Sequence, residues 1–217
     1  MQKETTVGFF TSDKFDENFK SKLSDCDVAL FVIKDLSFVK IKSELEGKSE
    51  LFLKMGEISK AIKGACVFSA TTDTYGTIRQ SALCFSGGKL KTIADANSVY
   101  DKNYAASFGV KSVRASERSF GVAVGDDLTD CDLLKAIVMT ENDAIINLSP
   151  DIYEFDKEKL VCSLAYVFST PVVSVSFTKK VIAGDMGELL YSGKDEFYKC
   201  VVPIRKRYRE KFSKVKF

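Results

Sequence analysis

The sequence has 217 residues, of which 45% are hydrophobic, and a formal net charge of +2. It contains no histidine, which excludes serine–histidine and cysteine–histidine hydrolases and every histidine-ligated metal site. Its length suits one large core, and its three prolines form no linker, so we predict one domain over residues 1–203.

Short apolar runs alternate with amphipathic runs along the chain. The first half predicts strands at 6–10, 27–33, 65–69, 78–85 and 90–93, helices at 16–24 and 51–62, and a turn at 71–76. The second half predicts strands at 110–115, 120–124, 144–148, 172–177, 180–183, 188–191 and 197–202, and helices at 131–140 and 157–168. Because some strands are joined by helices and others by hairpins, we predict an α/β sandwich of two mixed sheets with helices outside.

Several short motifs follow these elements in a fixed order. The run FGVAVGDDL at 120–128 gives a glycine, an apolar strand and a sharp turn; FVIKDLS at 31–37, SALCF and GGKL at 81–90, DAIINLS at 143–149 and VIAGDMGEL at 181–189 accompany it. Together, over about residues 7–202, they resemble the nitrilase superfamily of carbon–nitrogen hydrolases, and the GDDL run resembles the amidase domain of glutamine-dependent NAD synthetases. The resemblance implies a four-layer α-β-β-α sandwich and a homodimer or higher homo-oligomer that pairs through helices.

The resemblance also assigns three positions to the family's catalytic residues. Gly125 stands where the family has its nucleophilic cysteine, Ala96 where it has the lysine that stabilises the oxyanion, and Asp35 where it has the general-base glutamate. A register shifted by two residues would put Ile33 in the last slot. Glycine cannot attack and alanine cannot stabilise charge, so we expect a non-catalytic protein that binds a small molecule or a partner through a degenerate site. Glycine would also relax the strained turn on which the nucleophile sits.

A replacement nucleophile would make the protein a divergent amide or nitrile hydrolase. Cys131 lies six residues after Gly125, at the start of a predicted helix, where the helix dipole can lower the pKa of a thiol. The more ordinary role for Cys131 is packing at the helix start, behind Thr129 and Asp130 as capping residues.

A metal ion is the other catalytic alternative. Asp126 and Asp127, with Asp35, supply the carboxylate oxygens that a divalent cation prefers. The more ordinary role for Asp127 is to accept hydrogen bonds from backbone amides of the turn. We therefore predict no metal, and no cofactor either, since the sequence lacks GxGxxG and P-loop patterns.

The last residues, 204–217 (IRKRYREKFSKVKF), form a basic tail with seven Lys or Arg and one Glu. Such a tail can contact nucleic acid or an acidic membrane surface. Because the rest of the chain is not basic, we favour a solvated or subunit-packing arm and consider nucleic acid an unlikely partner.

The chain shows none of the sequence features of export. Its N-terminal segment has charges rather than a long apolar run, and no 18 consecutive residues are apolar, so we expect neither a signal peptide nor a membrane span. Its six cysteines are scattered, without a CxxC pair. Buried free thiols in a reducing cytoplasm explain them better than disulfides.

Overall fold

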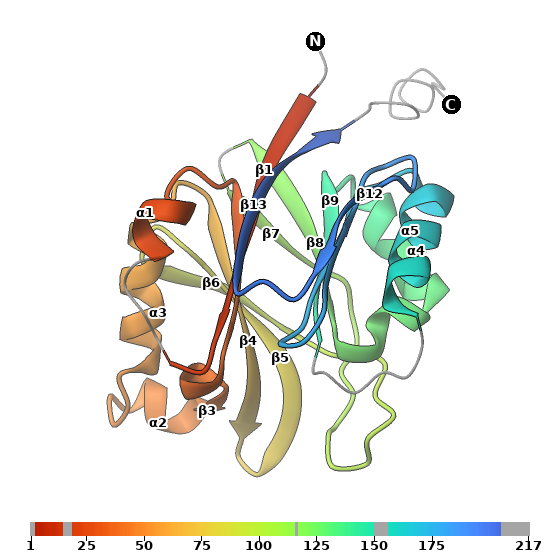
Figure 1. The fold of residues 1–217 in the computed structure, drawn as a ribbon. Coiled ribbons are helices and arrows are strands. Elements are labelled where there is room, and N and C mark those ends of the chain that lie inside the picture. The colour runs from red at the N-terminus through yellow and green to blue at the C-terminus, as the bar shows by residue number, and fades with distance from the viewer. Residues whose placement is uncertain (1–2, 15–18, 116, 150–155, 205–217) are drawn as a thin grey trace, which may run out of the picture.

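The computed structural model describes residues 3–14, 19–115, 117–149 and 156–204. Two β-sheets lie face to face, with helices on both outer sides (Figure 1). One sheet is covered by α1 (Phe19–Leu23), α2 (Ile41–Leu45) and α3 (Leu51–Lys60), and the other by α4 (Cys131–Met139) and α5 (Lys157–Phe168). The predicted four-layer α-β-β-α sandwich is therefore confirmed. None of the described helices has the length and hydrophobicity needed to cross a membrane.

The first sheet has the strand order β13-β1-β2-β4-β5-β6, with β3 paired beside β4. Strands β1, β2 and β4 run parallel, as do β3 and β4, whereas β13, β5 and β6 pair antiparallel with their neighbours. The bounds are β1 Lys3–Ser12, β2 Val28–Ile33, β3 Phe38–Lys40, β4 Ala65–Thr74, β5 Thr77–Ser86, β6 Lys89–Asp95 and β13 Phe197–Ile204.

The second sheet has the strand order β12-β11-β10-β9-β8-β7. Its centre, β8, β9 and β10, is parallel because α4 and α5 connect these strands, while β7, β11 and β12 pair antiparallel at the sides. The bounds are β7 Lys111–Ala115, β8 Arg118–Val124, β9 Ala144–Leu148, β10 Val172–Val175, β11 Lys180–Ala183 and β12 Leu189–Gly193.

Strand alternation divides the apolar side chains between three core layers. Along β8, Val122 and Val124 enter the cluster between the two sheets, whereas Ala123 belongs to the cluster beneath α4 and α5. A third cluster joins the first sheet to α1 and α3. Both faces of the central strands are therefore buried, which explains their continuous apolar runs.

The predicted turn at 71–76 is too long. The structure continues β4 to Thr74 and starts β5 at Thr77, leaving a two-residue turn in which Tyr75 and Gly76 both have positive φ, +53° and +86°. Positive φ at both central positions matches the right-handed twist of a hairpin, so polar residues here extend the strands. The short elements 34–36, β3 and α2 were not predicted, and the first residues of the predicted helix at 16–24 lie outside the described ranges.

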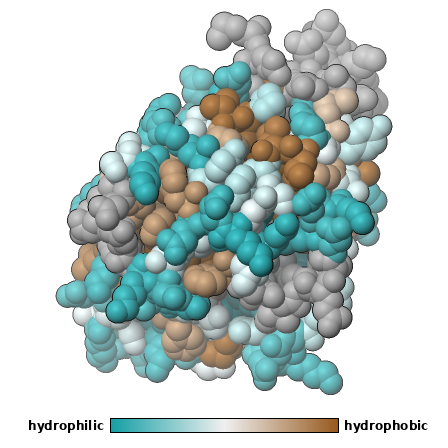
Figure 2. Space-filling view, in the orientation of Figure 1, coloured by the Kyte–Doolittle hydropathy of each residue, from teal (hydrophilic) through white to brown (hydrophobic). Residues whose placement is uncertain are grey.

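The edge strands β12 and β13 of the two sheets lie on one face of the molecule (Figure 1). Figure 2 shows apolar side chains gathered in the upper part of this view. On the two edge strands, Leu189 of β12 and Val201 of β13 are about half exposed. The chain continues from β13 into the basic tail, whose residues 205–217 lie outside the described ranges.

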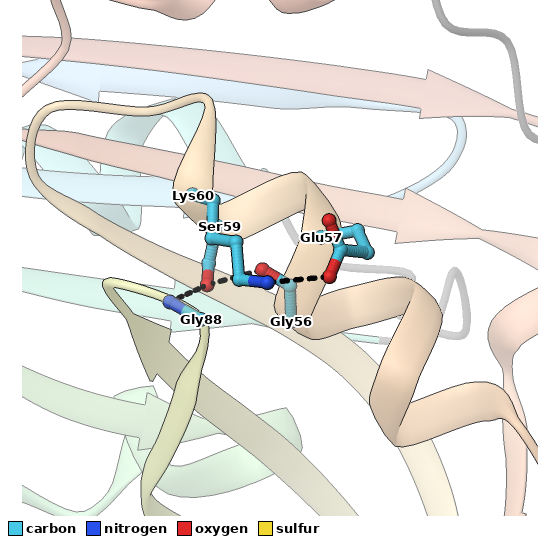
Figure 3. A network of polar contacts seen from close by, with 5 residues as sticks. All are labelled: Gly56, Glu57, Ser59, Lys60 and Gly88. Carbon is cyan, nitrogen blue, oxygen red and sulfur yellow. Dashed lines mark hydrogen bonds and ion pairs between the residues drawn. The ribbon is translucent and has the colours of Figure 1, made fainter.

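Helix α3 is fixed to the turn between β5 and β6 through one serine (Figure 3). The hydroxyl of the fully buried Ser59 accepts from the Gly88 N–H at 2.9 Å and donates to the Gly56 carbonyl at 2.9 Å. Gly56 permits this approach, because a Cβ there would lie 3.0 Å from the Gly88 carbonyl oxygen. On the outer side of the same turn of α3, exposed Lys60 and Glu57 form an ion pair at 2.6 Å.

We expect Ser59→Ala to lower the free energy of unfolding by about 1–2 kcal/mol, because the Gly88 N–H loses its acceptor. Glu57→Gln serves as the control within the same contact network, with an expected change below about 0.5 kcal/mol, because an exposed ion pair contributes little. Urea denaturation of both variants measures the difference. Equal stability of the two variants would contradict the role given to Ser59.

Candidate functional site

Gly125 stands at the carboxyl end of β8 and begins the 3-10 turn η2 (Gly125–Thr129). Its φ is +56°, a left-handed conformation that costs a residue with a side chain about 1–2 kcal/mol. The Asn147 amide donates to the Gly125 carbonyl at 3.2 Å, and Ser174 donates to Asn147 Oδ1 at 2.9 Å. The turn is therefore bound to β9 and β10, and its backbone has the positive φ that glycine tolerates best.

Gln80 of β5 occupies the space in front of Gly125. A Cβ built at position 125 would collide with Gln80 Oε1, so any side chain there requires Gln80 to move. Gln80 is only 8% exposed, and its Oε1 has no hydrogen-bond partner among the described residues. Sequence reasoning missed Gln80, although alternation along β5 places it on the inner face with Ala82 and Cys84.

Ala96 follows directly after β6 and lies against the same glutamine. Its N–H donates to the Gln80 carbonyl at 2.9 Å, and its own carbonyl accepts from the Ser107 N–H at 2.8 Å. The methyl group is fully buried in the cluster between the sheets. Both predicted slots are thus next to Gln80: Ala96 contacts its backbone carbonyl, and Gly125 faces its side-chain oxygen.

Asp35 lies on a separate turn, directly after β2. Its side chain is exposed on the 3-10 turn Lys34–Leu36 after β2, and its N–H donates to the Asp13 carbonyl at 3.2 Å. The neighbouring Lys34 Nζ stands 4.1 Å from the ring centroid of Phe177, which places this turn at the carboxyl end of the second sheet as well. Ile33, the alternative in this slot, is buried on the helix side of the first sheet.

The carboxylate of Asp127 is a structural acceptor. It is fully buried and accepts from the Val124 N–H at 2.9 Å and from the Asn97 and Ser98 N–H groups at 2.8 Å each. Burial raises the pKa of Asp127, against the opposing effect of these backbone donors. These contacts agree with the predicted role of Asp127 as an acceptor for backbone amides of the turn. In addition, Asp127 accepts from two backbone amides of the loop that follows Ala96.

Asp126 has a half-satisfied carboxylate. It is 5% exposed, and its Oδ2 accepts from the Tyr100 N–H at 3.1 Å, whereas its Oδ1 has no partner among the described residues. Burial raises its pKa. The described residues contain no group of three or more His, Cys, Asp or Glu side chains that could hold a metal ion, so the grouping of Asp126 and Asp127 with Asp35 considered from the sequence is wrong.

Cys131 is the first residue of α4 and is exposed. Asp130 caps the helix, since its Oδ1 accepts from the N–H groups of Asp132 at 3.1 Å and Leu133 at 3.0 Å. The predicted cap is confirmed, whereas the expectation that the thiols are buried is wrong for Cys131. All six cysteines are free, and three of them are buried: Cys26, Cys66 and Cys84.

A small cavity opens beside Gly125 at the carboxyl ends of β8 and β9. Its volume is about 10 Å³, room for about one water molecule. Lys157, in the first turn of α5, donates to the Ser149 hydroxyl at 2.9 Å beside it. The cavity is lined by Gly125, Asp126, Leu128, Thr129, Asn147, Ser149 and Lys157.

No family model and no curated protein matches this sequence. Solved structures of the nitrilase superfamily do match the fold. A carbon–nitrogen hydrolase from Helicobacter pylori aligns with a TM-score of 0.73 and 12% identity over 92% of this chain and 89% of that chain. Nit3 of Saccharomyces cerevisiae, from branch 10 of the superfamily, aligns with a TM-score of 0.72 and 10% identity over 94% and 90%.

A glutamine-dependent NAD+ synthetase from Acinetobacter baumannii aligns with a TM-score of 0.70 and 16% identity over 92% of this chain, but over only 45% of that chain. At such identities the likeness establishes the fold alone. This chain therefore has the nitrilase-superfamily fold that its motifs predict.

The buried position of Asp126 predicts a specific pH dependence of stability. Because the folded-state pKa is raised above 3.8, ionisation of this carboxyl costs the folded protein stability as pH rises through the raised pKa. Asp126→Asn removes the ionisation and keeps an acceptor for the Tyr100 N–H. We expect the difference in Tm, variant minus wild type, to increase between about pH 4 and about pH 7. Thermal unfolding followed by circular dichroism measures it, and a difference independent of pH would refute the assignment.

Proposed function

We propose that this protein is a non-catalytic protein of the nitrilase fold, which binds a small molecule or a partner through its degenerate site. The observation that carries the proposal is the position of Gln80, whose side chain fills the space that a nucleophile at position 125 would need. Ala96, in the lysine slot, contributes only a buried methyl group. Asp35 is the single titratable group in the three slots, and it is exposed rather than buried beside Gly125.

A divergent amide or nitrile hydrolase is the alternative. Cys131 supports it by its exposure and by its place at the amino end of α4. The carboxylate pair supports it less, because both oxygens of Asp127 already accept hydrogen bonds. A nucleic-acid-binding role for the basic tail is the third reading, and it concerns residues almost entirely outside the described ranges.

Hydrolysis assays on a panel of amides and nitriles distinguish the non-catalytic protein from the divergent hydrolase. We expect no turnover by the wild-type protein, because no nucleophile stands at position 125. Turnover that disappears in Cys131→Ala would instead establish the alternative. The rate of ammonia release measures both outcomes.

The role of Gln80 is tested by stability in a double-mutant cycle. We expect Gly125→Cys alone to lower the free energy of unfolding by about 2–3 kcal/mol, from the positive φ and the displaced glutamine. Gln80→Ala in the same chain removes the collision. The free energy of unfolding of the double variant should therefore be higher, by about 0.5 kcal/mol or more, than the sum of the two single-variant changes predicts. Additive single effects, measured by urea denaturation, would show that Gln80 does not fill the slot.

We further propose a homodimer that pairs through α4 and α5. The outer faces of these helices carry exposed apolar side chains, with exposures of 82% for Met139, 64% for Tyr166 and 70% for Val167. Helices α4 and α5 lie together on one outer side of the sandwich (Figure 1). We prefer this face to the strand edges at β12 and β13, because the resemblance to the nitrilase superfamily implies pairing through helices. The free thiols agree with a cytoplasmic location.

The double variant Tyr166→Glu/Val167→Glu places two charges on the proposed dimer face. We expect it to be monomeric at micromolar concentration, because buried like charges oppose pairing. Sedimentation velocity gives the oligomeric state of both proteins. Leu189→Glu/Val201→Glu, on the strand-edge face, is the matched control and should leave the dimer intact. A monomeric wild type, or a variant that remains dimeric, would rule out this interface.

A further inference from the structure

We propose that residues 99–104 form a strap that opens when the buried carboxyl group of Asp126 ionises, with Tyr100 as the latch that holds it closed. The strap is part of the loop that connects β6 of the first sheet to β7 of the second, and it contacts the turn η2. The inference goes beyond the proposed function, because this conformational step needs neither a ligand nor a reaction.

Both ends of the strap are fixed to the body of the molecule. Before it, the Ser98 N–H donates to Asp127 Oδ1 at 2.8 Å, and the Ser98 hydroxyl donates to Asp130 Oδ2 at 3.1 Å. After it, the Ala105 N–H donates to the Ile78 carbonyl of β5 at 2.8 Å. The segment between these two anchors can therefore move without displacing either sheet.

Between the anchors, one residue makes the hydrogen bonds that hold the strap. The Tyr100 N–H donates to Asp126 Oδ2 at 3.1 Å, and the Tyr100 hydroxyl lies 3.4 Å from the Thr129 hydroxyl. Within the described part of the chain, no other hydrogen bond joins residues 99–104 to residues outside the strap. The Tyr100 side chain is 75% exposed, and only Val99 packs against the cluster between the sheets. Segments with so few buried contacts are the ones that open locally.

Burial of Asp126 opposes the closed position of the strap. The side chain is 5% exposed, and its oxygens accept one hydrogen bond from the described residues, that of the Tyr100 N–H. Burial raises the pKa of Asp126, and the Tyr100 N–H offsets this effect only in part. An ionised Asp126 is therefore better solvated when the strap is open and water reaches its carboxylate.

The elements around Asp126 carry both positive and negative groups. These are Asp127 and Asp130 on the same turn, Lys157 on α5, and Asp101 and Lys102 on the strap. Burial is nevertheless the largest contribution to the pKa of Asp126, and the Tyr100 N–H is the next. Because this pKa is higher in the closed form than in the open form, proton binding favours closure. Opening becomes more favourable as pH rises through the raised pKa.

Opening has a consequence at the candidate site. Val99 would leave the apolar cluster between the sheets, to which Ala96 and Val124 also belong. Ala96 is itself one of the predicted slots, and Val124 directly precedes Gly125. The open strap thus gives solvent access to the interior beside both slots.

Amide hydrogen exchange of the full-length protein, followed by NMR, tests the strap. The opening constant of the Tyr100 amide is compared with that of Val122, which lies in β8 between two neighbouring strands. Dividing each rate by the intrinsic exchange rate removes the pH dependence of the exchange chemistry. We expect the opening constant of Tyr100 to exceed that of Val122 by about tenfold or more. It should also rise between about pH 5 and about pH 7.

Asp126→Asn removes the charge and keeps an acceptor for the Tyr100 N–H. It should lower the Tyr100 opening constant at pH 7 by about fivefold or more and abolish its rise with pH, because a neutral amide is less costly to bury. Asp132→Asn, an exposed aspartate in the first turn of α4, is the matched control and should leave opening unchanged. Equal opening constants for Tyr100 and Val122, or the wild-type pH dependence in Asp126→Asn, would overturn the strap.

Discussion

Three backbone N–H groups converge on one buried carboxylate, that of Asp127, and the carboxyl end of the sandwich depends on this contact. One donor belongs to Val124 at the end of β8, and the other two belong to Asn97 and Ser98 in the loop after β6. The carboxylate thus joins a strand of one sheet to a loop of the other. Because charge-assisted hydrogen bonds in a dry environment are strong, this joint fixes the turn at Gly125 whether or not the turn carries a nucleophile.

The same joint holds the turn in place without help from a side chain at position 125. Gly125 and Ala96 lie within the region that Asp127 holds together. The side chain of Gln80 lies in front of Gly125, and its backbone carbonyl accepts from the Ala96 N–H. The stability of this fold comes from the close packing of its interior, and it does not require a catalytic side chain.

The sequence predicted the parts of the fold that depend on local pattern and missed those that depend on contacts. The apolar runs of β8 and β9 and the period of α5 predicted these elements closely, because burial on both faces leaves a clear pattern. The polar ends of β4 and β5 were assigned to a turn, since Thr and Asp in a hairpin carry no apolar signal. Asp130 was recognised as a cap from its position alone. Gln80 was not recognised, because its role depends on a strand that lies far away in the sequence.

Gln80 also bears on any attempt to place a side chain at position 125 by mutagenesis. Such a side chain would meet the terminal oxygen of Gln80, which belongs to β5 of the other sheet, and it would also have to adopt the φ of +56° that the turn imposes. The glutamine can rotate away because the contacting atom is the far end of a flexible side chain, whereas the turn is held by its hydrogen bonds. Opening a site at this position would therefore require an adjustment in both sheets at once.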